Sequence, residues 1–184
     1  MDGFARFVAE RGYELRFDKF AIFQNLYRPG ESEHIDLTAG RQLATDYYRL
    51  GAEHMEPVAG AVESLKMLAD AADIVILTNA PRVCVEPRRR WLDRHGLDFP
   101  FLLNEGPKGQ VVASLTGRTR GTTAFVDDLL HNLDSVAAAT PDTHRFQHVA
   151  DERLRAMAPS SPRHRRIDDW PTLAKELEAV LRGQ

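Results

Sequence analysis

The chain of 184 residues has one cysteine, four lysines and no long apolar run. A single cysteine, Cys84, excludes an internal disulfide and is typical of a reducing compartment. No run approaches the roughly 20 apolar residues that a membrane-spanning helix needs. Charged residues come early in the chain (Asp2, Arg6 and Glu10), so its start does not resemble a signal peptide. We therefore expect a cytoplasmic protein that does not associate with a membrane.

The chain also lacks a large net charge of either sign. A formal charge of −3 gives no overall attraction to nucleic acid or to anionic lipid, so we expect no nucleic-acid partner. The basic clusters at residues 88–91 and 163–166 are more simply explained as a solvated helix face and a loop. The histidines show no metal-ligand spacing with Cys84.

The length fits one domain, or one domain with a small insert. Helical spacing predicts amphipathic helices over residues 1–18, 38–52 and 58–70, with Pro57 opening the third. From Asp73 onward, short apolar runs alternate with helical patterns. We expect strands at 73–77, 101–103, 122–126 and 145–149, helices at 83–95, 108–115, 129–139 and 172–181, and a loop at 158–166. This alternation predicts a three-layer α/β sandwich with a parallel, Rossmann-like sheet.

Polar residues follow two of these apolar runs. Thr78 and Asn79 end the run that begins at Asp73, and Asp127 and Asp128 end the run that begins at Thr123. In open parallel sheets the chemistry takes place at the carboxyl ends of the strands. We therefore expect these four side chains to lie along one edge of the sheet.

The adjacent carboxylates Asp127 and Asp128 repel each other. A hard divalent cation relieves that repulsion, and Mg²⁺ prefers a few carboxylates together with water and phosphate oxygens. The alternative is that Asp128 caps the helix that begins near Leu129. His131 is close enough in sequence to be a further candidate for lining the same site.

Two further groups suit an anion. Thr78 and Asn79 precede a helix, where a hydroxyl and free backbone N–H groups form a phosphate site. Taken alone, these two residues are more simply explained as a turn with an N-cap, which Pro81 supports. Lys108 stands in the turn Gly106-Pro107-Lys108-Gly109, from which its ammonium can hold a phosphoryl group. The alternative for Lys108 is a solvated surface lysine.

Together, these runs resemble motifs two, three and four of the haloacid dehalogenase-like (HAD) phosphohydrolase superfamily. Residues 56–62 (Glu-Pro-Val-Ala-Gly-Ala-Val) resemble that family's helix before motif two. The resemblance covers residues 56–149, with 167–170 as a closing segment. It implies an α/β core over residues 56–184 and a small, mostly helical cap over residues 1–55. It also implies Mg²⁺-dependent hydrolysis of a small phosphomonoester through an aspartyl-phosphate.

The resemblance assigns a role to each candidate residue. Thr78 would bind the transferring phosphoryl group, with Asn79 supplying an amide. Lys108 would steady the nucleophile and the phosphate, which makes Thr78 and Lys108 the catalytic candidates in this chain. Asp127, with help from Asp128, would hold Mg²⁺.

The first motif of that family, Asp-x-Asp at the end of a central strand, is missing. Neither Asp2 nor Asp18 follows an apolar strand, so both are rejected as the nucleophile. The missing strand would lie between those ending at Leu77 and Val126. We therefore expect no hydrolysis by this chain alone. Our hypothesis is that the sequence is an N-terminally shortened version of a longer protein. The best internal substitute for the strand is the segment 20–23 (Phe-Ala-Ile-Phe).

Two alternatives remain. The first alternative is a non-catalytic HAD-like protein that binds phosphate or metal, or acts as a scaffold. A response-regulator-like receiver also uses an acidic pair, a threonine and a lysine. It places the acidic pair early and the lysine late, however, which is the reverse of the order found here.

Overall fold

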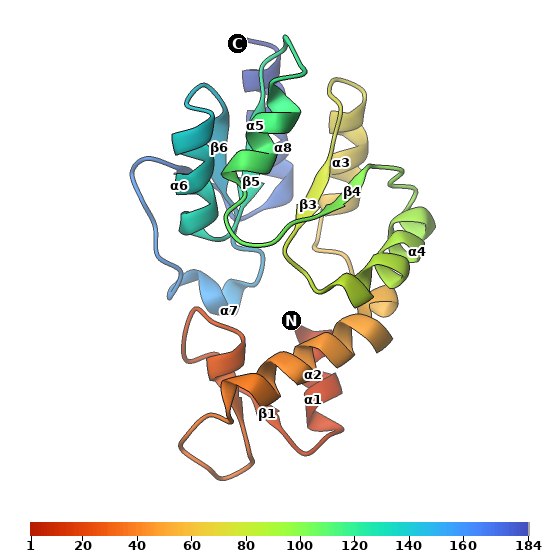
Figure 1. Ribbon diagram of the computed structural model, residues 1–184, viewed down its shortest axis with the longest axis vertical. Helices are drawn as coiled ribbons and strands as arrows, with labels where there is room; N and C mark the ends of the chain where they lie inside the picture. The colour runs from red at the N-terminus through yellow and green to blue at the C-terminus, as the bar shows by residue number, and fades with distance from the viewer. Residues whose placement is uncertain (184) are drawn as a thin grey trace. The chain divides into compact units, whose positions relative to one another are not determined.

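The computed structural model describes residues 1–183 and shows a mixed α/β protein (Figure 1). Its contacts divide the chain into two compact units. Unit 1 comprises Met1–Glu56, Ala80–Asp98 and Asp151–Ala158, and unit 2 comprises Pro57–Asn79, Phe99–Ala150 and the described residues from Pro159 onward. The predicted division into a cap domain at 1–55 and a core domain at 56–184 stays a prediction. No described helix is both long and apolar enough to cross a membrane.

Unit 1 is mainly helical. Its helices are α1 (Asp2–Ala9), α2 (Leu37–Leu50), α4 (Val85–His95) and α7 (Glu152–Arg155), with 3₁₀ turns at Phe23–Asn25, Ala52–His54 and Arg82–Cys84. The strands β1 (Glu14–Leu15) and β2 (Leu26–Tyr27) form an antiparallel pair. The helix expected over residues 1–18 is therefore wrong beyond Ala9. Gly12 takes a left-handed φ of +77°, which ends the helical turn and leads the chain into β1.

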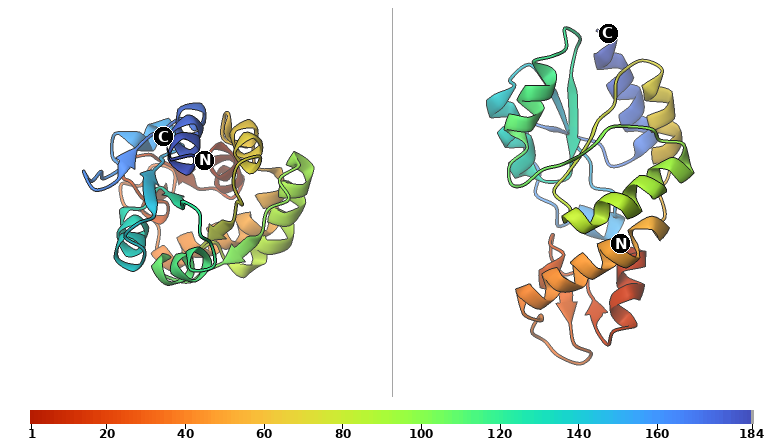
Figure 2. Two further views of the ribbon diagram at one scale, coloured as in Figure 1. Left: turned by 90° about the horizontal axis from the view of Figure 1, so that it is seen from above. Right: turned by 45° about the vertical axis from the view of Figure 1, so that its right-hand side comes forward.

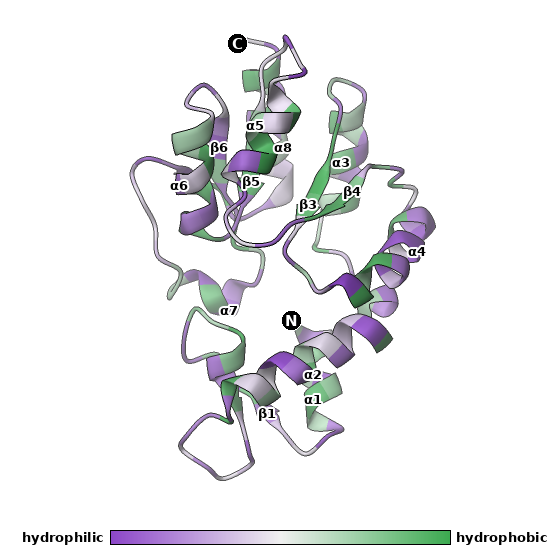
Figure 3. Cartoon of the chain, in the orientation of Figure 1, coloured by the Kyte–Doolittle hydropathy of each residue, from purple (hydrophilic) through white to green (hydrophobic). Residues whose placement is uncertain are grey.

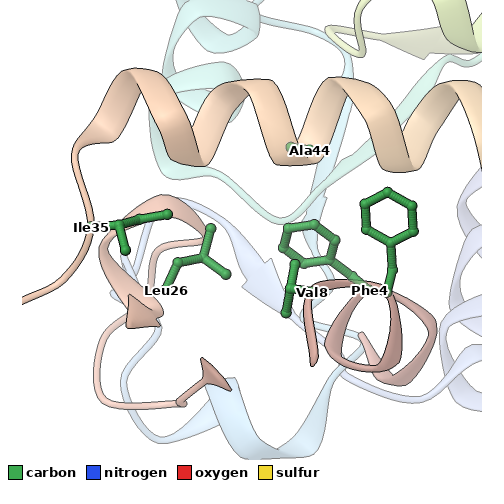
Figure 4. Packing of buried hydrophobic residues seen from close by; sticks show 6 residues of the cluster. Phe4, Val8, Leu26, Ile35 and Ala44 are labelled. Carbon is green, nitrogen blue, oxygen red and sulfur yellow. The ribbon is translucent and has the colours of Figure 1, made fainter. Parts of the chain in front are cut away.

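The core of unit 1 lies between its first two helices and the β1–β2 pair (Figure 4). Its buried members are Phe4, Phe7, Val8, Leu26, Ile35 and Ala44. Asp36 accepts hydrogen bonds from the backbone N–H groups of Thr38 and Ala39, which fixes the start of α2. The segment 20–23, the best internal candidate for the missing strand, forms bends and the start of a 3₁₀ turn in this unit and is not a strand.

Unit 2 holds the predicted alternation of strands and helices. In chain order it contains α3 (Ala61–Ala69), β3 (Ile76–Thr78), β4 (Phe101–Leu103), α5 (Gly109–Thr116), β5 (Ala124–Asp127), α6 (Leu130–Ala139), β6 (His144–Gln147), β7 (Arg165–Arg166) and α8 (Trp170–Leu181). The apolar character of β3 and β4 is visible in Figure 3. The mixed α/β class predicted from the sequence is confirmed.

The strands of unit 2 form two small parallel sheets. β3 pairs with β4, with Ile76 opposite Phe101. β5 pairs with β6, which pairs with β7. Among the described residues, no ladder joins β3 to β5. The loop expected at 158–166 is wrong at its end, because Arg165 and Arg166 form β7, whose charged side chains give no apolar signal.

The start of α3 also differs from the prediction. The helix begins at Ala61 rather than at Val58, because Gly60 holds a left-handed φ of +73° that is incompatible with a helical turn. A Cβ atom on Gly60 would lie 2.9 Å from Cδ of Pro171, at the start of α8. Glycine is therefore required here both for its φ and for the close approach of another segment.

The core of unit 2 joins its two sheets. α3 and α8 lie side by side (Figure 2). Between them and the strands is a cluster of buried residues, namely Leu68, Phe146, Leu173, Ala174 and Leu177. Ile74, just before β3, and Ala124 and Val126 of β5 pack against this cluster. The two sheets therefore share one core, although no backbone ladder joins them within residues 1–183.

Gly109 of α5 lies close to the backbone of α6. A Cβ atom at this position would overlap the carbonyl oxygen of Ser135. We expect Gly109→Ala to lower the free energy of unfolding by about 2 kcal/mol in urea titrations, because overpacking against backbone exceeds the gain in helix propensity. Gly121→Ala, in an open loop, is the control and should change stability by less than about 0.5 kcal/mol. An unchanged or higher stability of Gly109→Ala would contradict the prediction.

Candidate functional site

The acid pair stands at the carboxyl end of β5, where β6 fixes its backbone. The N–H of His148 donates to the carbonyl oxygen of Asp127 at 3.0 Å. Gln147, which is fully buried, donates from Nε2 to the carbonyl oxygen of Asp128 at 3.1 Å. Both aspartates therefore leave a rigid strand end rather than a free loop.

Asp127 forms a buried ion pair with Lys108. The distance from Lys108 Nζ to Asp127 Oδ2 is 2.7 Å, and the two residues keep only 9% and 8% of their surface exposed. The ammonium also lies 5.9 Å from the ring centroid of Phe125. A solvated surface lysine, the alternative weighed from the sequence, is therefore wrong.

The turn before α5 directs Lys108 inward. Gly106 has a left-handed φ of +76°, which a side chain would strain, and Pro107 follows it. Lys108 is then the N-cap residue of α5. The N–H of Gly109 donates to Ser135 Oγ at 3.0 Å, so the start of α5 is anchored on α6. Glycine is therefore required at Gly106 for its φ and at Gly109 for the close approach of α6.

The second carboxylate oxygen of Asp127 holds the start of α6. Asp127 Oδ1 accepts from the N–H of Leu129 at 2.9 Å and from Asn132 Nδ2 at 3.0 Å. Leu129 is the N-cap residue of α6 and forms no side-chain cap. The expectation that Asp128 caps this helix is therefore wrong, because Asp127 satisfies the N–H of Leu129.

Asn132 is a site residue that the sequence reasoning missed. It is 1% exposed, whereas the neighbouring candidate His131 is exposed. Its Oδ1 is buried and has no hydrogen-bond partner among the described residues. The available signal was an amide in the first turn of the helix that follows the acid pair.

Asp128 is the residue of this site with a raised pKa. Desolvation by surrounding atoms and the charge of Asp127 raise the pKa of Asp128 to about 6, while Lys108 opposes the rise. The residue nevertheless remains exposed, so solvent and ions reach it. Ionised Asp128 is therefore held at an energetic cost that a bound cation would relieve.

The end of β3 is connected to this acid pair by the loop 104–108. Asn79 Nδ2 donates to the carbonyl oxygen of Gly106 at 2.9 Å, and Asn104 Nδ2 donates to Asn79 Oδ1 at 2.7 Å. The N–H of Asn104 donates to the carbonyl oxygen of Thr78 at 2.8 Å. The next helical segments begin with Pro81 and Cys84 as N-cap residues, so neither Thr78 nor Asn79 has the N-cap role.

The structure thus brings Lys108, Asp127 and Asp128 into direct proximity and places Asn79 against their connecting loop. Thr78 stands beside Asn79 at the end of β3. Among residues 1–183, no group of three or more His, Cys, Asp or Glu side chains is arranged to hold a metal ion. A pair of carboxylates still fits Mg²⁺, which commonly takes its other ligands from water and phosphate oxygens.

The chain matches no model of a known protein family and no curated protein. Membership in the HAD superfamily therefore stays a prediction, which rests on the motifs and on where their residues lie.

The Lys108–Asp127 pair yields a first prediction for this site. Lys108→Met leaves the Asp127 carboxylate buried without its partner, and we expect a loss of about 3 kcal/mol in the free energy of unfolding. The double variant Lys108→Met with Asp127→Asn should recover part of that loss, as a double-mutant cycle in urea would measure. Lys66→Met, at an exposed lysine of the same unit, is the control. Equal losses in the single and double variants would contradict a direct pair.

Asp128 yields a prediction for pH. Its folded pKa lies above its ordinary value of 3.8, so its contribution to stability is present at low pH and is lost as pH rises through about 6. Asp128→Asn should therefore stabilise the metal-free protein by about 1 kcal/mol at pH 7.5, allowing for solvent screening, and much less at pH 4.

Thermal unfolding in EDTA at both pH values measures this difference. Asp142→Asn, at an exposed acid of unit 2, is the control and should show no such dependence. A stabilisation by Asp128→Asn that is equal at the two pH values would refute the assignment.

Proposed function

We propose that the carboxyl end of β5 binds Mg²⁺ together with a phosphoryl group, as in the core of a HAD-like phosphohydrolase. The observation that carries this proposal is the buried Lys108–Asp127 pair beside the perturbed carboxyl group of Asp128. A lysine and two adjacent carboxylates at a strand end combine attraction for a phosphate with attraction for a cation.

The proposal extends to the fold. We infer that the β3–β4 pair and the β5–β6–β7 sheet are the two halves of a Rossmann-like parallel sheet within a three-layer sandwich. This interpretation is supported by the shared core beneath β3 and β5 and by the loop that connects their carboxyl ends.

Each side chain has a task in the proposed site. Asp127, oriented by Lys108 and Asn132, and the exposed Asp128 would hold the metal. The Lys108 ammonium would attract the phosphoryl oxygens, and the Thr78 hydroxyl and Asn79 would bind them from the end of β3. Mg²⁺, when bound, would neutralise charge on the acids and on the phosphoryl group.

Two outcomes are compatible with this site. Hydrolysis of a small phosphomonoester through an aspartyl-phosphate needs a nucleophilic aspartate, and neither Asp2 nor Asp18 follows an apolar strand. Asp127 is engaged by Lys108, Leu129 and Asn132, which favours a structural and metal-binding role over nucleophilic attack. We therefore propose binding without turnover for these residues alone, and hydrolysis only with a nucleophile strand added.

Mg²⁺ binding is the first test. At tenfold excess over its dissociation constant, Mg²⁺ should raise the free energy of unfolding by about 1.4 kcal/mol, and inorganic phosphate should add to this only when Mg²⁺ is present. Asp127→Asn should lose both effects relative to its own metal-free state, and Asp142→Asn should keep them. Calorimetric titration gives the affinities directly.

Turnover separates the two outcomes. Hydrolysis of p-nitrophenyl phosphate by the wild-type chain, lost in Asp127→Asn, would overturn binding without turnover and favour a phosphatase. A wild-type chain that responds neither to Mg²⁺ nor to phosphate would refute the proposed site.

A further inference from the structure

Lys108 stands at a helix position that its own side chain cannot serve. It is the N-cap residue of α5, and the first N–H groups of a helix have no acceptor within that helix. Serine, threonine, aspartate and asparagine are preferred at such a position, because their side-chain oxygens accept from these N–H groups. An ammonium only donates, and the ammonium of Lys108 is paired with Asp127. The start of α5 therefore needs an acceptor from elsewhere in the fold.

Ser135 of α6 supplies that acceptor. Its Oγ accepts from the N–H of Gly109, the first residue of α5, at 3.0 Å, and donates to the carbonyl oxygen of Asn132 at 2.9 Å. A bond from a serine hydroxyl to a carbonyl oxygen of its own helix is a common local pattern, but acceptance from another helix is not part of that pattern. This second bond requires the close approach at Gly109, where a Cβ atom would overlap the carbonyl oxygen of Ser135.

These contacts complete a hydrogen-bonded ring that starts and ends at Lys108. Lys108 Nζ donates to Asp127 Oδ2 at 2.7 Å, and Asp127 Oδ1 accepts from Asn132 Nδ2 at 3.0 Å. The carbonyl oxygen of Asn132 accepts from Ser135 Oγ, which in turn accepts from the N–H of Gly109. Gly109 is the covalent neighbour of Lys108. Lys108 is therefore held through its side chain by Asp127 and through its adjoining backbone by Ser135.

The two attachments of Lys108 fix different things. The ion pair fixes the ammonium relative to Asp127, but the carbon stem of a lysine is flexible and can follow its partner from several starting points. The bond between Gly109 and Ser135 fixes the backbone from which that stem begins. A group whose position is fixed before binding loses less entropy when it takes up a ligand.

We propose that Ser135 is a positioning residue for the phosphate site, and that its hydroxyl fixes the start of α5 so that the Lys108 ammonium contacts Asp127 and a phosphoryl oxygen together. This inference rests on the proposed function, in which Lys108 attracts the phosphoryl group. Ser135 acts through Gly109 and Lys108, and not by contact with the metal or the phosphate.

Loss of the Ser135 hydroxyl should therefore affect the two proposed ligands unequally. Asp127 keeps its bonds to the N–H of Leu129 and to Asn132 Nδ2, neither of which passes through Ser135. The carboxylates that would hold Mg²⁺ stay in place, whereas the ammonium that would hold phosphate loses the attachment of its backbone. A role of Ser135 confined to the packing of α5 on α6 would give no such difference between the ligands.

Calorimetric titration of Ser135→Ala with Mg²⁺ and with inorganic phosphate tests this difference. Alanine is the most favourable residue in a helix, so the variant should fold. We expect the dissociation constant of phosphate at saturating Mg²⁺ to rise about tenfold, because a hydrogen bond to a charged group is weakened, and that of Mg²⁺ to change less than about twofold.

Ser114→Ala is the matched control for this titration. Ser114 Oγ donates to the carbonyl oxygen of Gln110 within α5 and is not a member of the hydrogen-bonded ring. This variant should leave both dissociation constants as they are in the wild type. Equal weakening of Mg²⁺ and phosphate binding by Ser135→Ala, or no change in either, would overturn the proposal.

A second measurement tests the role of Ser135 even if the chain binds neither ligand. Acetic anhydride acetylates accessible lysine amines, and peptide mass spectrometry follows each lysine separately. In EDTA and without phosphate, the acetylation rate of Lys108 relative to that of exposed Lys66 should rise about threefold or more in Ser135→Ala, because the buried pair opens more often. Ser114→Ala should leave this ratio unchanged.

The two measurements separate the inference from the proposed function. Faster acetylation of Lys108 in a Ser135→Ala chain whose wild type binds neither Mg²⁺ nor phosphate would refute the proposed function and support the positioning of the ammonium by Ser135. An unchanged acetylation rate in Ser135→Ala would overturn that positioning role, whether or not the wild type binds the ligands.

Discussion

The buried ion pair between Lys108 and Asp127 is the interaction on which the candidate site depends. It joins the turn before α5 to the end of β5, and the other oxygen of Asp127 holds the start of α6 through Leu129 and Asn132. Two helices and a strand therefore take their relative positions from one carboxylate. Burying a charged pair costs desolvation energy, and the hydrogen bonds to both oxygens of Asp127 offset that cost.

Asp127 is satisfied in this way, and Asp128 is the member of the acid pair whose pKa is raised. Its carboxyl group remains exposed, and desolvation and the charge of the neighbouring Asp127 raise its pKa while the charge of Lys108 opposes that rise. Adjacent residues at the end of β5 thus acquire different properties, because Asp127 is buried as the last residue of the strand and Asp128, just beyond it, is exposed. The difference comes from the end of β5 at Asp127 and from the contacts of Asp127 with the start of α6, and not from the chemistry of the residues themselves.

The sequence predicts β3, β4, β5 and β6 of unit 2, since short β-branched runs are typical of buried parallel strands. The expected bounds of the first of these are wrong, because β3 spans Ile76–Thr78 and not 73–77. The sequence also locates the acid pair and Lys108. It does not predict β1 and β2, which are two residues long and have no periodic signal, nor β7, whose residues are both arginines. Asn132 was missed because an amide in a helix has no distinctive pattern, and its role arises only when α6 folds back onto Asp127. The start of α3 was missed because the conformation of Gly60 depends on the approach of Pro171, far away in the sequence.

The loop 104–108 has a mechanical consequence. It is tied at one end to Asn79, on the sheet of β3 and β4, and at the other end to Asp127, on the sheet of β5 to β7. Because only a few residues separate these two attachments, the loop is a short covalent connection between the two sheets. Any change in the separation of the sheets pulls on Gly106 and displaces the ammonium of Lys108 from its carboxylate. A change in the spacing of the strands would therefore also change the electrostatics of the acid pair.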